Sequence, residues 1–167
     1  MSQRGTPSLQ SVGEILNFRE NIFHCSGQTE SIIIHCEDEA LDTMNEWCVK
    51  QHGESGLTQA CRESQVSCQQ AERKVLEMLE KHTESGQCPL AGNSVGQDRK
   101  FIDKYMPSLA AWLHYRTVDV STIKELAKRW YPRVYEVAPK KDGSHRALGD
   151  IEESIKELQY YRENLFK

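Results

Sequence analysis

The segment that most constrains the fold is a capped amphipathic helix followed closely by a short apolar strand. The helix is expected over Ser67–His82, and Ser67-x-x-Gln70 has the form of a capping box, which satisfies free backbone N–H groups at a helix start. Leu90–Ala91 is the strand candidate, and Gly92 ends it. A helix and a strand that each carry an apolar face must bury those faces together, so the pattern predicts α/β packing. The predicted buried face of the helix is Ala71, Val75, Met78 and Leu79.

Other segments alternate between helical spacing and short strand-like runs, which predicts one α/β domain of helices packed on a sheet. The other expected helices are about Ser11 to Phe23, Leu41–His52, Asp98 to Tyr105 (closed by Pro107), Thr122–Trp130 and Ile151–Asn164. The other expected strands are Ile32–Ile34 and Val118–Val120. A Ser/Gly/Thr-rich connection is expected to run through Thr58, and a mobile Lys/Pro/Gly-rich loop from Val134 to Ser144.

The composition excludes several classes of protein. A hydrophobic fraction of 38% and a charged fraction of 28% suit a soluble domain, and 167 residues bury roughly 70% of their unfolded surface. No apolar run approaches the roughly 20 residues that cross a bilayer, so no membrane partner is expected. A net charge of −4 argues against long duplex nucleic acid but permits a short oligonucleotide, which carries few phosphates.

Six cysteines leave two interpretations open. They are an even number, but no two have CxxC spacing and none stands near paired histidines, as a zinc site would require. A disulfide framework or zinc site is therefore the weaker interpretation, and reduced thiols of an intracellular protein are expected. The cysteines are Cys25, Cys36, Cys48, Cys61, Cys68 and Cys88.

Three residues have the chemistry of metal-assisted phosphodiester cleavage. His145 precedes Asp150 by about one helical turn, and Asp98 is a carboxylate from a distant segment. Carboxylates can hold Mg²⁺ or Mn²⁺, and a histidine can accept a proton from the attacking water. A structural interpretation stands beside this one: Asp150 as a helix cap, His145 as a solvated loop residue, and Asp98 as a first-turn acid favoured by the helix dipole.

The sequence around these residues resembles the oligoribonuclease family. The resemblance covers about residues 31 to 167 and has the details of the animal, mitochondrial form. It implies a ribonuclease H-like exonuclease fold with a mixed sheet flanked by helices, and 3′–5′ degradation of short oligoribonucleotides with Mg²⁺ or Mn²⁺. It also implies a homodimer in a mitochondrial or cytoplasmic setting. The matching stretches are Trp47 to Leu57, Cys88 to Pro107, His114 to Pro132 and Ser144 to Lys167.

The resemblance assigns a role to each matching position. Asp98 and Asp150 match metal ligands, His145 matches the general base, and Tyr115 matches a residue of the active site. Trp47 matches a residue that packs on the bases, although it can also be the core anchor of its helix. Arg116 matches a residue that reaches the active site from the partner subunit. The residues that match the cap on the terminal phosphate are His52, Ser94, Arg116 and Ser121.

Two departures from the family pattern qualify these expectations. Gly149 stands where the family carries a second acid beside Asp150, and residues 1–30 lack the Asp-x-Glu strand that supplies two further metal ligands. Residues 1–30 are therefore expected to be a divergent segment, with the first strands of the exonuclease domain (31–167) missing or replaced. The leading hypothesis is an exoribonuclease. The alternatives are a catalytically impaired module that binds nucleotides or dimerises, and a fragment without a stable fold.

Overall fold

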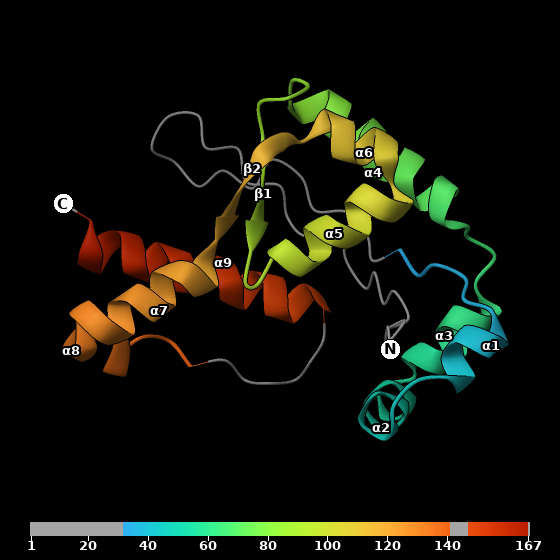
Figure 1. The fold of residues 1–167 in the computed structure, drawn as a ribbon, viewed down its shortest axis with the longest axis horizontal. Helices are drawn as coiled ribbons and strands as arrows, with labels where there is room; N and C mark the ends of the chain where they lie inside the picture. Colours follow the sequence, from blue (N-terminus) through green and yellow to red (C-terminus); the bar gives the residue numbers. More distant parts are fainter. Residues whose placement is uncertain (1–31, 141–146, 167) are drawn as a thin grey trace.

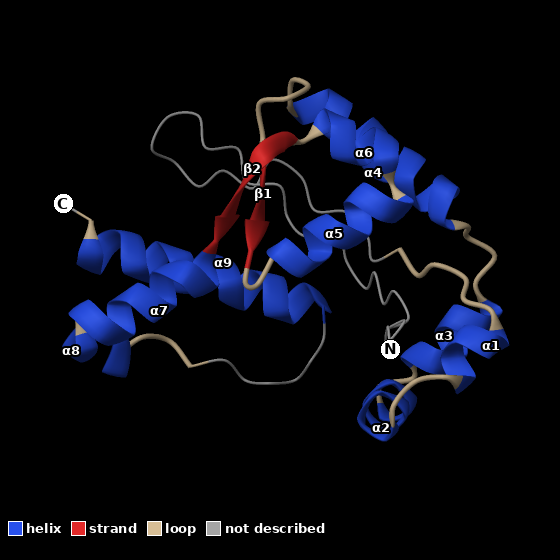
Figure 2. Cartoon of the chain, in the orientation of Figure 1, coloured by secondary structure: helices blue, strands red, loops and turns tan. Residues whose placement is uncertain are grey.

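The computed structural model describes residues 32–140 and 147–166 as a helix-rich α/β fold (Figure 1). Within these residues two parallel strands lie between two groups of helices, which Figure 2 shows by secondary structure. The expected fold class is confirmed. The strands are β1 (Pro89–Gly92) and β2 (His114–Asp119). The helices are α1 (Asp38–Asp42), α2 (Glu46–Glu54), α3 (Leu57–Glu63), α4 (Cys68–His82), α5 (Gly96–Tyr105), α6 (Pro107–Trp112), α7 (Val120–Trp130), α8 (Pro132–Glu136) and α9 (Ala147–Leu165).

The two strands divide the apolar packing into two clusters. Ala91 pairs with Val118 and Gly92 with Asp119, and α5 and α6 form the crossover that parallel strands require. Because successive side chains of a strand point to opposite faces, Leu90 enters one cluster and Ala91 the other. The larger cluster comprises Ala71, Val75, Leu79, Leu90, Val95, Ile102, Met106, Leu109 and Leu113. The smaller cluster comprises Ala91, Val120 and Leu158.

Helix α4 confirms the strongest prediction from the sequence. Ser67 accepts a hydrogen bond from the backbone N–H of Gln70, and the Gln70 side chain accepts one from the Ser67 N–H, which completes the capping box. Ala71, Val75 and Leu79 are each 1% exposed, so the apolar face lies in the larger cluster. The capping box and the helical period therefore determine this element locally.

The strand predicted over Val118–Val120 is wrong at its last residue. Asp119 ends β2 and caps α7, because its carboxylate accepts the backbone N–H of Ser121 at 2.9 Å. Val120 is consequently the first residue of the helix rather than the last of the strand. The helix predicted over Thr122–Trp130 is confirmed with this earlier start.

The strand predicted over Ile32–Ile34 is also wrong. This segment is extended but joins no ladder among the described residues. It is hydrogen-bonded instead to the connection between α3 and α4. The Ser64 Oγ donates to the Ile33 carbonyl at 2.6 Å, and the His35 N–H donates to the Val66 carbonyl at 2.8 Å. Ile32 and Ile34 pack against the larger cluster, so burial rather than strand pairing explains the β-branched run.

The single helix predicted over Leu41–His52 is two helices. Helix α1 ends at Asp42, and Asn45 caps α2 by accepting the backbone N–H of Cys48 at 2.9 Å. Asparagine competes for backbone groups in this way and so favours a new helix start over continuation. The connection predicted through Thr58 is shorter than expected, because α3 begins at Leu57, directly after Gly56 in a left-handed conformation.

The end of the chain follows the predictions more closely. Helix α9 contains the expected Ile151–Asn164 helix, and α5 contains Asp98 and ends before Pro107, as expected. Pro107 also begins α6, which the sequence reasoning missed. The loop predicted from Val134 is partly α8, while residues 141–146 and the helix predicted near Ser11 to Phe23 lie outside the described residues.

Two further expectations concern thiols and membranes. Among the described residues, the cysteines outside any disulfide are Cys36, Cys48, Cys61, Cys68 and Cys88, and Cys25 lies outside the described residues. None of the helices in the described ranges combines the length and apolar composition that a bilayer-spanning segment requires.

Candidate functional site

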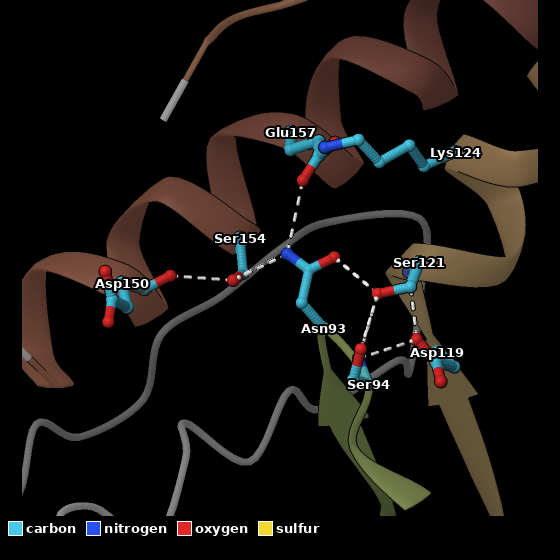
Figure 3. Close-up of polar contacts among 8 residues, drawn as sticks. All are labelled: Asn93, Ser94, Asp119, Ser121, Lys124, Asp150, Ser154 and Glu157. Atoms are coloured by element: carbon cyan, nitrogen blue, oxygen red, sulfur yellow. Dashed lines mark hydrogen bonds and ion pairs between the residues drawn. The ribbon is translucent and has the colours of Figure 1, made fainter. Parts of the chain in front are cut away.

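The carboxyl ends of β1 and β2 meet α7 and α9, and a chain of polar side chains fills this meeting point (Figure 3). In open sheets of parallel strands, ligands usually bind at the carboxyl ends of the strands. We name this set of side chains the polar junction. Its members are Asn93, Ser94, Asp119, Ser121, Lys124, Ser154 and Glu157.

Ser94 and Ser121 form the exposed end of the polar junction. Their hydroxyl oxygens lie 3.2 Å apart although the residues are 27 positions apart in the chain. Ser94 has a φ of 56°, which is uncommon for a residue with a side chain, and its backbone N–H donates to the Asp119 carboxylate at 3.0 Å and to the Ser121 Oγ at 2.9 Å. Asp119 thus holds the backbones of both serines, and two residues predicted to bind the terminal phosphate are brought together.

Asn93 connects this serine pair to α9. Its amide oxygen accepts the Ser121 hydroxyl at 3.0 Å, and its amide nitrogen donates to the Ser154 Oγ at 2.8 Å and to the Glu157 Oε2 at 3.2 Å. Figure 3 shows Asn93 between α7 and α9, with its amide facing both helices. The side chain therefore uses both its acceptor and its donors at a half-buried position.

The inner end of the polar junction is an ion pair between a buried glutamate and a partly exposed lysine. The Glu157 side chain is 2% exposed and its Oε1 lies 3.1 Å from the Lys124 Nζ. Ser154, one turn earlier on α9, donates its hydroxyl to the carbonyl of Asp150 at 2.7 Å. The network thus extends from the serine pair to the first turn of α9, where the predicted metal ligand Asp150 lies half-buried.

Asp98, the other predicted metal ligand, lies in the first turn of α5. The residue is exposed, but protein atoms around the carboxyl desolvate it and raise its pKa above the ordinary value. A hydrogen bond from its own backbone N–H acts in the opposite direction, and the negative charge of Asp119 adds to the rise. Asp98 therefore senses the charge of the polar junction, and a nearby cation would favour its ionised form.

Tyr115 and Arg116 lie on β2, upstream of the polar junction. Tyr115 is 73% exposed, and its ring lies 4.4 Å from the His114 ring and 5.1 Å from the Arg116 guanidinium carbon. The backbone N–H of Arg116 donates to the His114 Nδ1 at 3.1 Å. These contacts make an exposed aromatic and cationic surface on the strand.

Trp47 and His52 both lie on α2, and Trp47 is 61% exposed. Helix α2 packs beside α3, and Figure 1 shows it apart from the strand ends and from α9. The structure therefore does not bring these two predicted substrate residues against the serine pair. A shared cavity that includes Trp47, His145, Asp98 and Asp150 stays a prediction.

The predicted metal site is only partly within the described residues. Among residues 32–140 and 147–166, no three histidine, cysteine, aspartate or glutamate side chains gather so as to hold a metal ion. His145 lies outside these residues. Asp98 and Asp150 supply oxygen atoms of the kind that hard divalent cations prefer, but the described side chains alone do not complete such a site.

Sequence reasoning missed most of the polar junction. Asn93 immediately precedes Ser94 after a strand, and Asp119 precedes Ser121 at a helix start, so position alone was a usable signal for both. Lys124, Ser154 and Glu157 carry no local signal, because each resembles an ordinary solvated helix residue in the sequence.

The chain matches the family model described as "Exonuclease" over residues 16–158. It is 59% identical over 137 residues to "Oligoribonuclease, mitochondrial" of Homo sapiens, which covers 82% of this chain and 58% of the human protein. The chain therefore spans a little over half the length of that relative.

Two shorter relatives are matched over more of their own length. "Probable oligoribonuclease" of Dictyostelium discoideum is 56% identical over 137 residues, covering 82% of this chain and 71% of that protein. "Oligoribonuclease" of Marinobacter nauticus is 57% identical over 136 residues, covering 81% of this chain and 75% of that protein.

Proposed function

Because the chain belongs to the exonuclease family, and within it to the oligoribonucleases, we propose that it is a 3′–5′ exoribonuclease acting on short oligoribonucleotides. The product would be mononucleotides, released by hydrolysis of the terminal phosphodiester. The observation that carries the proposal is the Ser94–Ser121 hydroxyl pair at the carboxyl ends of the parallel strands. The name of the human relative further supports a mitochondrial location.

The proposed substrate contacts use groups that recognise phosphate and bases. The Ser94–Ser121 pair would form part of the site for the terminal phosphate, together with the imidazole of His52 and the guanidinium fork of Arg116. Trp47 would stack on a base, a contact that tolerates any base sequence. Arg116 lies on the exposed surface of β2, and we propose that it serves the partner subunit of a homodimer, with Tyr115 beside it.

The proposed metal ligands are Asp98 and Asp150, with His145 as the base. A bound Mg²⁺ or Mn²⁺ would polarise the phosphodiester and lower the pKa of a water. His145 would accept the proton from that water.

A second candidate function is binding without efficient cleavage. Residues 1–30 of the sequence contain no aspartate, so they lack the Asp-x-Glu pair that the resemblance implies for a complete two-metal site. We propose that residues 31–167 form the exonuclease domain and that this 167-residue chain hydrolyses RNA slowly. Two carboxylates hold Mg²⁺ weakly, because this ion requires near-octahedral oxygen coordination.

The test is release of mononucleotides from a short RNA by the 167-residue chain with Mn²⁺, with His145→Ala as the control. We expect slow release from the 3′ end that is lost in the control and rises when an Asp-x-Glu strand is grafted upstream. Phosphate-dependent binding of the RNA without any release would support the binding module instead. Neither release nor binding would contradict both functions.

A further inference from the structure

Asn93, which lies on neither helix, contacts both α7 and α9 by hydrogen bonds. Its amide orientation is determined by its surroundings: Glu157 offers only acceptor oxygens when ionised, so the NH₂ group must face α9 and the carbonyl oxygen must face Ser121. The Ser154 hydroxyl fits this arrangement, because it donates to the Asp150 carbonyl and so accepts from Asn93.

The count of hydroxyl hydrogens then distinguishes the two serines. Each hydroxyl has one hydrogen, and that of Ser121 goes to the Asn93 amide oxygen at 3.0 Å. In the 3.2 Å contact between the two hydroxyls, Ser94 must therefore be the donor. Ser121 also accepts the Ser94 backbone N–H at 2.9 Å, so its one donor and both acceptor positions are occupied.

Ser94 has the opposite character. It is exposed, and its hydroxyl hydrogen can turn from Ser121 to an incoming phosphate oxygen with the loss of a single hydrogen bond. The backbone of Ser94 does not move with it, because Asp119 holds its N–H at 3.0 Å. Ser121 is half-buried and would lose its bond to Asn93 if it donated to the ligand.

We propose that Asn93 is a positioning residue for the terminal phosphate. Its amide oxygen accepts the Ser121 hydroxyl, so Ser94 is the hydroxyl that donates to the phosphate. Its amide nitrogen connects the serine pair to α9 by hydrogen bonds. The inference rests on the proposed function and adds a residue and a division of labour to it. Asn93 does not itself touch the substrate: it accepts the Ser121 hydroxyl, and its bonds to α9 anchor the backbone directly before Ser94.

The experiment measures affinity for a 5′-phosphorylated diribonucleotide and for the same diribonucleotide without that phosphate, in EDTA, so that no hydrolysis occurs. The ratio of the two affinities is the phosphate preference. Ser94→Ala should lower this ratio about tenfold, because a hydrogen bond to a charged group contributes about 1.4 kcal/mol or more. Ser121→Ala should lower it less than threefold, since its hydrogen is directed at Asn93.

Asn93→Leu, which has a similar size and no amide, removes the bonds that anchor the residue before Ser94 to α9. It should lower the phosphate preference about tenfold while affinity for the unphosphorylated probe changes little. Asn164→Leu, on the exposed last turn of α9, is the matched control and should leave the ratio unchanged. If Asn93→Leu does not fold, the two serine variants still decide the proton assignment.

The outcomes separate this inference from the proposed function. A ratio that falls in Ser94→Ala but persists in Asn93→Leu would overturn the role of Asn93 alone. A loss in Ser121→Ala as large as that in Ser94→Ala would overturn the assignment of the donor. A wild-type protein without any phosphate preference would overturn the inference together with the proposed phosphate site.

Discussion

The two sides of the β1–β2 sheet are held together in different ways. On the side of α4, α5 and α6, the larger cluster consists of nonpolar side chains that are at most 4% exposed. On the side of α7 and α9, the smaller cluster is supplemented by the polar junction, which contains a buried glutamate paired with Lys124 and an asparagine amide. Apolar packing is undirected, whereas hydrogen bonds fix side-chain orientation. The side that carries the candidate site is thus the side where orientation is specified.

Two buried glutamates show the same difference between the two sides of the sheet. Glu72, 8% exposed on α4, accepts the backbone N–H groups of Ser108 and Leu109 at 2.7 and 3.0 Å and so caps the start of α6. Glu157, on α9, contacts side chains instead: it pairs with Lys124 and accepts a hydrogen bond from the Asn93 amide. The first glutamate closes a helix end that would otherwise leave N–H groups unpaired. The second orients Asn93, which in turn accepts the Ser121 hydroxyl.

The largest expected effect is on the apolar side. Leu79→Ala removes a side chain that is 1% exposed in the larger cluster and should lower the free energy of unfolding by about 3 kcal/mol. Leu158→Ala, the matched change in the smaller cluster, should lower it by about 2 kcal/mol, because fewer apolar side chains surround it. Urea unfolding measures both. Equal losses, or a greater loss for Leu158→Ala, would contradict the proposed difference between the two sides.

The next effect tests the ion pair of the polar side. Lys124→Met leaves the buried Glu157 carboxylate without its cation and should lower the free energy of unfolding by about 2 kcal/mol. Adding Glu157→Gln should recover part of this loss, because the uncompensated charge is then gone. Lys156→Met, at an exposed position of α9, is the control. A Lys124→Met protein as stable as this control would show that the pair contributes nothing.

The smallest effect is a pH dependence. Burial raises the pKa of Tyr161 to about 12, and the nearby charge of Glu157 adds to the rise. A raised pKa in the folded protein means that stability from the neutral phenol is complete below the unfolded pKa and is lost as pH rises toward the folded value. Tyr161→Phe should therefore lose less stability than the wild type when urea midpoints at pH 9 and pH 11 are compared.

Tyr160→Phe serves as the neighbouring control for that comparison. It removes the hydrogen bond from the Tyr160 hydroxyl to the Val134 carbonyl at 2.8 Å, so its urea midpoint should already be lower at pH 9. A Tyr161→Phe protein that loses as much stability as the wild type between the two pH values would show that Tyr161 does not cause the pH dependence.

The elements that could be predicted from the sequence are those with local causes. The capping box at Ser67 and Gln70 and the helical period after it predicted α4, and Leu90–Ala91 was recognised as a strand. Ile32–Ile34 could not be predicted correctly, because a strand exists only where a partner offers a ladder, and Ile32 and Ile34 are partly buried by packing instead. In the candidate site, Ser94 and Ser121 were named from the resemblance, but their contact across 27 positions required the structure.

The family, the helical periods, the caps and the chemical types available at the site follow from the amino-acid sequence, because each of these depends on residues close together in the chain or on a recognisable family pattern. Which groups share hydrogen bonds follows only from the three-dimensional fold. Asn93 meets Glu157 across 64 positions, and its amide can face only one way between Ser121 and α9. Such contacts arise from the crossover of a parallel sheet, which brings distant strand ends and helices to one edge and leaves no pattern in the local sequence.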